Sequence, residues 1–125
     1  MTKRSTKIIL IVDDSETIRM SIKMTLTEAG YEVIEARNGI EGLAMLAEFP
    51  VDMLVTDLNM PHLDGIGLAR EARRLPGGRF MPIIMLTTES ERHKKEHGRD
   101  VGVSGWIAKP FKPHQLLGVV QMVMP

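Results

Sequence analysis

The sequence predicts an α/β fold in which helices cover both faces of a five-stranded parallel sheet, a doubly wound arrangement. Three observations predict it: the chain contains five short apolar runs, stretches with helical spacing separate them, and three of the runs are almost continuously apolar. A strand that is buried on both faces has such an unbroken apolar run. Because strands and helices alternate, the strands are expected to join through right-handed βαβ units into one parallel sheet.

The expected strands are, in chain order, Lys7–Val12, Tyr31–Ala36, Val51–Thr56, Met81–Leu86 and Trp106–Ala108. Apolar residues repeat at helical spacing after each of the first three strands and after the last one. These residues are Ile18, Ile22, Leu26 and Ala29 in the first helix; Ile40, Leu43, Ala44 and Ala47 in the second; Leu68, Ala72 and Leu75 in the third; and Leu116, Val120 and Val123 in the last.

A fifth helix is expected over Ser90–Val101, between the fourth and fifth strands. This stretch contains a single apolar residue and an internal glycine, Gly98. Such a helix has almost no face to bury, and the glycine costs about 1 kcal/mol relative to alanine. We therefore expect it to be the most mobile helix.

Length and composition indicate one globular domain over residues 1–125. Lys and Arg together number 16, as do Asp and Glu, and this neutral balance gives no indication of nucleic-acid binding. The absence of cysteine excludes disulfides and thiol chemistry. The apolar run Ile8–Val12 is too short for a signal peptide or a membrane span, so the expected location is the cytoplasm.

Polar side chains follow four of the expected strands. They are Asp13 and Asp14 after the first strand, Asp57 after the third, Thr87 and Thr88 after the fourth, and Lys109 after the fifth. Because the carboxyl ends of parallel strands meet at one edge of the sheet, we expect these side chains to lie together there. Taken singly, Asp14 could merely cap a helix and Asp57 could form a turn. Their joint occurrence at strand ends is what indicates a site.

Three neighbouring carboxylates predict a site for a divalent cation. Their mutual repulsion is relieved by a hard ion such as Mg²⁺, which typically binds one or two carboxylates together with phosphate oxygens. One carboxylate oxygen can then act as a nucleophile toward phosphorus. Lys109 would neutralise the transferred phosphoryl group, and the Thr87 hydroxyl would donate a hydrogen bond to it.

Four motifs, in this order, resemble the signature of response-regulator receiver domains. They are Val12-Asp13-Asp14-Ser15, Thr56-Asp57-Leu58-Asn59-Met60-Pro61 with Asp64-Gly65, Thr87 after Ile83-Ile84-Met85-Leu86, and Lys109-Pro110-Phe111. The resemblance extends over essentially the whole chain. It implies a flavodoxin-like sheet with strand order 2-1-3-4-5, an order for which a member of this family is a standard example.

The resemblance also implies the roles of the acidic residues. Asp57 would be the phosphoacceptor, and Asp14 and Asp57 would bind Mg²⁺ directly. Asp13 would act on the ion through water, and the backbone carbonyl of Asn59 would complete the protein ligands.

Further roles follow for residues around the acidic cluster. Lys109 would bind the phosphoryl group and form a cis peptide bond with Pro110. Thr87 and Trp106 would be the switch residues, although the family usually has Tyr or Phe where this chain has Trp106. Asn59 and Glu89 occupy the two positions that tune hydrolysis.

A receiver of this kind is a phosphorylation-activated switch rather than an enzyme, because it catalyses only its own phosphorylation and dephosphorylation. A histidine kinase would donate the phosphoryl group, and the surface of the fourth helix, fifth strand and fifth helix would change to control a protein partner. The runs Leu86-Thr87-Thr88-Glu89 and Ser104-Gly105-Trp106 resemble chemotaxis-type (CheY-like) stand-alone receivers. The implied partners are then the flagellar motor switch and a phosphatase; a monomer is expected, without nucleic-acid or membrane binding.

Other functions remain open at this point. A stand-alone receiver can also serve as a phosphate sink or a phosphorelay intermediate. A haloacid-dehalogenase type of Mg²⁺-dependent phosphatase would use the same groups, but it requires an Asp where this chain has Asn59. The run from His93 to His97 matches the inverted zinc-protease motif H-x-x-E-H. A flavin module of the same fold would suffer repulsion between its phosphate and the three carboxylates.

Three surface features complete the expectations. His62 and His114 are expected to be exposed, and the basic residues Arg70, Arg73, Arg74 and Arg79 are expected to form a solvated face. The last helix is apolar on nearly all sides, which indicates a docking or dimer surface.

Overall fold

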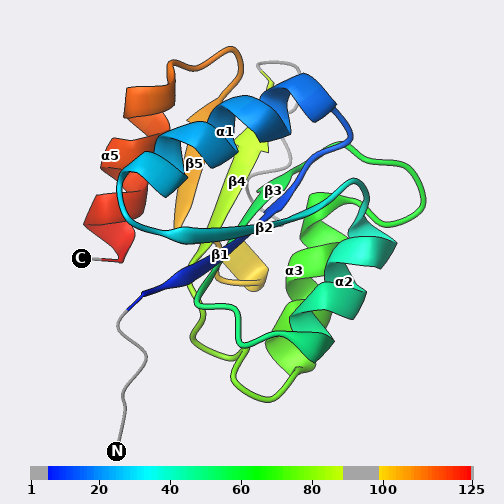
Figure 1. Ribbon diagram of the computed structural model, residues 1–125. Coiled ribbons are helices and arrows are strands. Elements are labelled where there is room, and N and C mark those ends of the chain that lie inside the picture. Colours follow the sequence, from blue (N-terminus) through cyan, green and yellow to red (C-terminus); the bar gives the residue numbers. More distant parts are fainter. Residues whose placement is uncertain (1–5, 89–98, 125) are drawn as a thin grey trace, which may run out of the picture.

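The computed structural model describes residues 6–88 and 99–124 of the chain. Its five strands are β1 (Ile8–Val12), β2 (Glu32–Ala36), β3 (Met53–Asp57), β4 (Ile83–Thr87) and β5 (Gly105–Ala108). They form one parallel sheet in the order β2-β1-β3-β4-β5 (Figure 1). The predicted parallel sheet and its implied strand order are both confirmed.

Four helices lie within the described residues, where the sequence predicted five. They are α1 (Glu16–Glu28), α2 (Gly39–Glu48), α3 (Gly65–Arg74) and α5 (Pro113–Val123). Most of the segment predicted as the remaining helix, Ser90–Val101, lies outside the described residues. The prediction that this helix is mobile therefore concerns residues that the structure does not describe. Within that segment only Arg99 and Asp100 are described as helical. No helix in residues 6–88 or 99–124 has the length and apolar character needed to cross a membrane.

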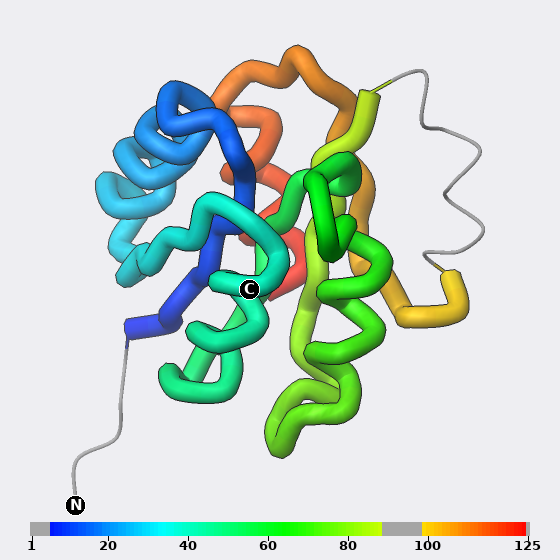
Figure 2. Tube along the Cα trace, turned by 90° about the vertical axis from the view of Figure 1, so that its right-hand side faces the viewer, coloured from blue at the N-terminus to red at the C-terminus, as the bar shows by residue number. Residues whose placement is uncertain are grey.

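The helices cover the two faces of the sheet in pairs, α1 with α5 and α2 with α3 (Figures 1 and 2). Successive strand residues alternate between these faces, as the pleat requires. Ile9 and Ile11 of β1 pack on the side of α1 and α5, whereas Leu10 and Val12 pack on the side of α2 and α3. Each residue of β1, β3 and β4 is buried, which accounts for their unbroken apolar runs.

Only part of the predicted face of helix α2 meets the core: Leu43 packs against it, whereas Ala44 and Ala47 are exposed. Ile40, which the helical spacing assigned to the core, is 60% exposed, while Gly39 and Gly42 are buried. A Cβ atom on Gly42 would lie 2.9 Å from Cγ2 of Val12, so the glycine permits a close approach of helix to strand. The prediction was wrong for Ile40, Ala44 and Ala47 because it did not count glycines as residues of the buried face.

The helices that follow β1, β2 and β3 each begin with a side-chain cap. Ser15 accepts a hydrogen bond from the N–H of Ile18, Asn38 from that of Glu41, and Asp64 from that of Gly67. Such caps satisfy backbone donors that have no partner within the helix. Ser15, not Asp14, is therefore the cap of α1, which leaves Asp14 available for another role.

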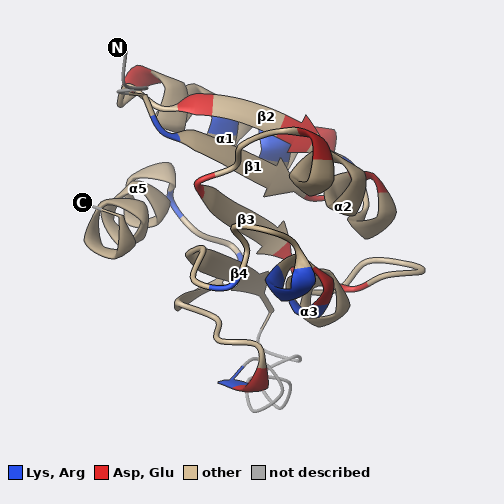
Figure 3. Ribbon diagram, turned by 90° about the horizontal axis from the view of Figure 1, so that it is seen from below, with Lys and Arg blue, Asp and Glu red and all other residues tan. Residues whose placement is uncertain are grey.

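Arg73 does not belong to a solvated basic face. Helix α3 carries several basic residues (Figure 3), but the Arg73 guanidinium donates to four backbone carbonyls. These acceptors are the carbonyls of Gly78, Met81, Val101 and Gly102, at 2.6–2.8 Å. Burial lowers the pKa of Arg73 from its ordinary value. Because Arg73 links the loop before β4 to the segment before β5, the prediction of a solvated side chain at this position is wrong.

We expect Arg73→Met to lower the free energy of unfolding by about 2 kcal/mol, because several carbonyls lose a charged donor. Arg74→Met provides a matched control, since Arg74 is 69% exposed and pairs with Glu71 on the same helix. That control should change stability by less than about 0.5 kcal/mol. Urea denaturation of both variants measures the difference, and equal effects would contradict the assigned role of Arg73.

Candidate functional site

Three aspartates meet at the carboxyl edge of the sheet. Asp13 and Asp14 directly follow β1, and Asp57 is the last residue of β3. One carboxylate oxygen from each lies within 4.8 Å of those of the other two. Asp13 is fully buried and Asp57 is 6% exposed, whereas Asp14 is exposed to solvent. The cluster is therefore reachable from outside at Asp14, and its carboxylates are close enough to share one cation.

Lys109 lies between two of these carboxylates. Its Nζ atom donates to Oδ2 of Asp13 at 2.9 Å and is 3.3 Å from Oδ1 of Asp57. The main chain fixes its position, because the N–H of Lys109 donates to the carbonyl of Thr87 at 2.7 Å. The Lys109–Pro110 peptide bond is cis, as the resemblance implies. Sequence reasoning thus correctly brought Lys109 to the acidic cluster.

Burial and charge act against each other in this site. Burial raises the pKa of Asp57, the positive charge of Lys109 lowers it, and the negative charge of Asp13 raises it again; the net shift is upward. Burial alone would lower the pKa of Lys109, but its contacts with Asp13 and Asp57 outweigh burial and raise it. Lys109 is accordingly held as a cation where carboxylates would otherwise repel one another.

Asp13 has hydrogen bonds to both of its carboxylate oxygens. Oδ2 accepts from Lys109, and Oδ1 accepts from the N–H of Ser15 at 2.9 Å. Its own N–H donates to the carbonyl of Ala36 in β2 at 3.2 Å. These hydrogen bonds fix the position of Asp13 and of its carboxylate. Lys109 and Ser15 thus already occupy both carboxylate oxygens of Asp13, whereas Asp14 is exposed to solvent.

The loop after β3 packs tightly against Asp57. Gly65 donates its N–H to the carbonyl of Leu58, and a Cβ atom on Gly65 would lie 2.5 Å from the carbonyl oxygen of Asp57. Only glycine tolerates so close an approach. Asn59 follows Leu58 and is exposed at the same edge of the sheet.

The two implied switch residues lie on adjacent strands. Thr87 is the last residue of β4 and is 2% exposed, and its hydroxyl donates to the carbonyl of Thr88 at 3.2 Å. Trp106 in β5 is opposite Met85 of β4 and packs, partly buried, against the core beneath α2 and α3. Glu89 and the histidine motif at His93–His97 lie outside the described residues.

The ends of β3 and β4 lie one residue beyond the predicted ones, whereas β1, β2 and β5 end where predicted. Asp57 and Thr87 each close a strand instead of following it. As the final ladder residues they are held more firmly than loop residues would be. The predicted exposure of His62 and His114 is confirmed.

One residue at the site has no motif in the sequence. Arg19 of α1 donates from Nη1 to the carbonyl oxygen of Asp13 at 2.7 Å and from Nε to Glu35 at 3.3 Å. The sequence does contain one indication of its role. Arg19 is a cation between the apolar helix positions Ile18 and Ile22, about one turn after the start of a helix that follows the acidic cluster. A charge so near the buried face needs a nearby acceptor.

A mostly apolar cavity of about 370 Å³ opens beside Lys109. It lies between α1 and the segment after β5. Its lining residues are Ile18, Ser21, Thr88, Lys109, Pro110 and Phe111. The acidic cluster therefore adjoins a recess that can receive part of another molecule.

Comparison with known proteins agrees with this geometry. The family profile of the response regulator receiver domain matches residues 9–121. Chemotaxis protein CheY1 of Helicobacter pylori is 39% identical over 118 residues, which cover 93% of this chain and 95% of that protein. The phosphate regulon regulator PhoB of Pseudomonas aeruginosa is also 39% identical over 118 residues, but the match covers 94% of this chain and only 52% of PhoB.

Solved structures give the same result. Chemotaxis response regulator CheY4 of Vibrio cholerae superposes with a TM-score of 0.90 at 41% identity, covering 96% of this chain and 100% of that one. Fold, site geometry and sequence relatives agree, and the chain belongs to the response regulator receiver domain family.

Proposed function

We propose that this protein is a chemotaxis-type signalling switch that accepts a phosphoryl group on Asp57 from a histidine kinase. The observation that carries the proposal is the acidic cluster at the sheet edge with Lys109 3.3 Å from Asp57. In the transfer, an oxygen of Asp57 would form a bond to phosphorus while the bond from phosphorus to the donor imidazole breaks. The imidazole would leave with the electrons of that bond and take up a proton.

Asp14 and Asp57 would hold Mg²⁺ directly, with Asp13 acting through water and the backbone carbonyl of Asn59 as a further ligand. The donor set fits, because Mg²⁺ favours carboxylate and carbonyl oxygens together with those of a phosphate. When bound, Mg²⁺ neutralises charge on the transferred phosphoryl oxygens. A receiver domain of sensor histidine kinase PA1611 from Pseudomonas aeruginosa, solved with a magnesium ion in its active site cleft, is 30% identical with a TM-score of 0.84, covering 95% of this chain and 98% of that one.

The chain's own residues would supply the remaining stabilisation. Lys109, now shared by Asp13 and Asp57, would turn to a phosphoryl oxygen and neutralise part of its charge. Thr87 would exchange its bond to the carbonyl of Thr88 for one to the phosphoryl group. The recess beside Lys109 would admit the donor side chain and its apolar neighbours.

The output of the switch would follow from the movement of Thr87. Its departure would leave room beside β5 for Trp106 to turn inward, which would change the surface of the fourth helix, β5 and α5. Moving an inactive-to-active ratio from 1:99 to 99:1 requires about 5.5 kcal/mol. A few charge-assisted hydrogen bonds, at roughly 1.5–3 kcal/mol each, are sufficient.

A chemotaxis role is supported by relatives that this chain matches along almost their whole length. We accordingly propose the flagellar motor switch as the target, a phosphatase as a further partner, and the cytoplasm, where kinases obtain ATP, as the location. The protein would catalyse only its own phosphorylation and dephosphorylation. A hydrolase of the haloacid-dehalogenase kind is disfavoured, because the position two residues after Asp57 carries an amide in Asn59.

Mg²⁺ should stabilise the fold by about 2.7 kcal/mol at a concentration of about 100 times its dissociation constant. The melting temperature should therefore rise by several degrees in the wild type and much less in Asp14→Asn and Asp57→Asn. Asp64→Asn is the matched control, since asparagine also caps a helix and Asp64 lies outside the cluster. Equal Mg²⁺ shifts in all four proteins, measured by thermal denaturation, would remove the cation from the acidic cluster.

Acetyl phosphate with Mg²⁺ should add the mass of one phosphoryl group to the wild type and none to Asp57→Asn. Lys109→Met should slow the addition on the order of 100-fold, because one charged donor to the phosphoryl group is lost. The exposed Lys112 gives the control variant Lys112→Met, which should react at the wild-type rate. Intact-mass spectrometry measures each case, and labelling that persists in Asp57→Asn would refute the assigned acceptor.

Beryllofluoride with Mg²⁺, a mimic of the phosphoryl group, should change the fluorescence of Trp106, which is the single tryptophan of the chain. The physical reason is a new environment for the indole after it turns. Asp57→Asn should show no change under the same conditions. An unaltered wild-type spectrum at saturating beryllofluoride would exclude the proposed movement of Trp106.

A further inference from the structure

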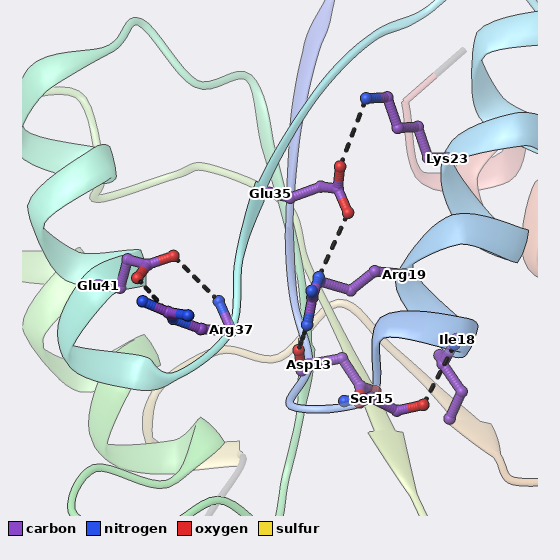
Figure 4. Close-up of polar contacts among 8 residues, drawn as sticks. All are labelled: Asp13, Ser15, Ile18, Arg19, Lys23, Glu35, Arg37 and Glu41. Atoms are coloured by element: carbon purple, nitrogen blue, oxygen red, sulfur yellow. Dashed lines mark hydrogen bonds and ion pairs between the residues drawn. The ribbon is translucent and has the colours of Figure 1, made fainter.

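We propose that Arg19 is a positioning residue for the acidic site and that it sets the Mg²⁺ affinity by fixing the peptide between Asp13 and Asp14. The inference rests on the proposed Mg²⁺ binding and adds a residue to which no motif points. Figure 4 shows the arrangement: the Arg19 guanidinium lies between the turn after β1 and Glu35 of β2.

Arg19 makes two directed contacts at once. Nη1 donates to the carbonyl oxygen of Asp13 at 2.7 Å, and Nε donates to Oε1 of Glu35 at 3.3 Å. Its side chain is only 16% exposed, so these contacts are less screened by water than an ordinary surface pair. A guanidinium presents donors in a fixed planar fork, and a flexible ammonium cannot reproduce this geometry.

The second contact gives the guanidinium a firm support. Glu35 belongs to β2 and is opposite Ile11 of β1 in the parallel ladder. Its other carboxylate oxygen, Oε2, is 3.4 Å from Nζ of Lys23 on α1. Arg19 is therefore held by a residue of the sheet itself, and it transmits that rigidity to the turn.

The carbonyl oxygen of Asp13 is the atom through which Arg19 affects Asp14. That oxygen belongs to the Asp13–Asp14 peptide, and a peptide is planar. Holding its oxygen fixes the plane from which the Asp14 backbone continues. Asp14 is exposed, and it belongs to the acidic cluster. Its direction toward an ion thus depends on the backbone that Arg19 holds.

A purely electrostatic account of Arg19 predicts the opposite effect. Removing a positive charge near an acidic site would strengthen cation binding, whereas loss of positioning would weaken it. The two accounts can be separated with Glu35, because Arg19→Gln combined with Glu35→Gln leaves the net charge unchanged. Positioning predicts weaker binding in both the single Arg19 variant and the double variant.

Isothermal titration of the full chain with MgCl₂, without any phosphodonor, provides the test. Arg19→Gln and the double variant should bind Mg²⁺ about 10-fold more weakly than the wild type, as for other residues that orient metal ligands. Arg37→Gln is the matched control, because Arg37 also pairs with a glutamate at 3.4 Å, namely Glu41, but lies 75% exposed and has no role in holding Asp13. It should bind as the wild type does.

Arg19→Lys keeps the charge and gives a second, milder variant should the glutamine variants fail to fold. It should weaken Mg²⁺ binding by a smaller factor, because one ammonium cannot hold both acceptors. In the acetyl phosphate reaction, each Arg19 variant should require more Mg²⁺ for half the maximal rate but reach the wild-type rate at saturation. A role in stability alone would not shift that midpoint.

The outcomes separate the two proposals. Absence of Mg²⁺ binding by the wild type would overturn the proposed function together with this inference. Wild-type binding with unchanged or tighter binding in folded Arg19 variants would overturn the inference alone. An effect of Arg37→Gln as large as that of Arg19→Gln would also overturn the inference, because the loss of any nearby ion pair between arginine and glutamate would then weaken Mg²⁺ binding.

Discussion

The repulsion among three carboxylates at one edge of a parallel sheet is the constraint on which the site depends. Burial makes that repulsion stronger, because the surrounding protein screens charge less than water does. Lys109 relieves it between Asp13 and Asp57, while the exposed Asp14 remains open to solvent. The site therefore has an imbalance of charge, with three carboxylates and one ammonium group. That imbalance is a cost to folding, yet it would also be the source of the proposed affinity for a cation and of the proposed phosphoryl chemistry.

Much of the fold and the position of the cluster could be predicted from the sequence, because both follow from strand periodicity. An unbroken apolar run marks a central strand, and parallel strands must end on the same side. Asp57 could be assigned to that edge without knowledge of any contact. The prediction that it follows the strand was off by one residue, since periodicity locates a strand but not its last hydrogen bond.

The features that could not be predicted are contacts between side chains and backbone carbonyls. From the sequence, Arg73 was predicted to be one of several surface cations. The four backbone carbonyls that accept its hydrogen bonds come together only in the folded loops. The buried face of α2 was predicted only in part for a related reason: Gly42 allows a close approach because it has no side chain, and an apolar pattern does not include it. Both cases depend on distances between segments far apart in the sequence, which local spacing does not encode.

Arg19 and Arg73 act at opposite edges of the sheet, and together they restrict where a conformational change can occur. Arg19 fixes the backbone after β1, and Arg73 fixes the segments that precede β4 and β5. The Thr87 hydroxyl at the carboxyl edge of β4 has a different kind of contact, because it donates to the carbonyl of its own chain neighbour, Thr88. A phosphoryl group on Asp57 would therefore compete with one local bond of the Thr87 hydroxyl, while the contacts of Arg19 and Arg73 hold other parts of the framework in place.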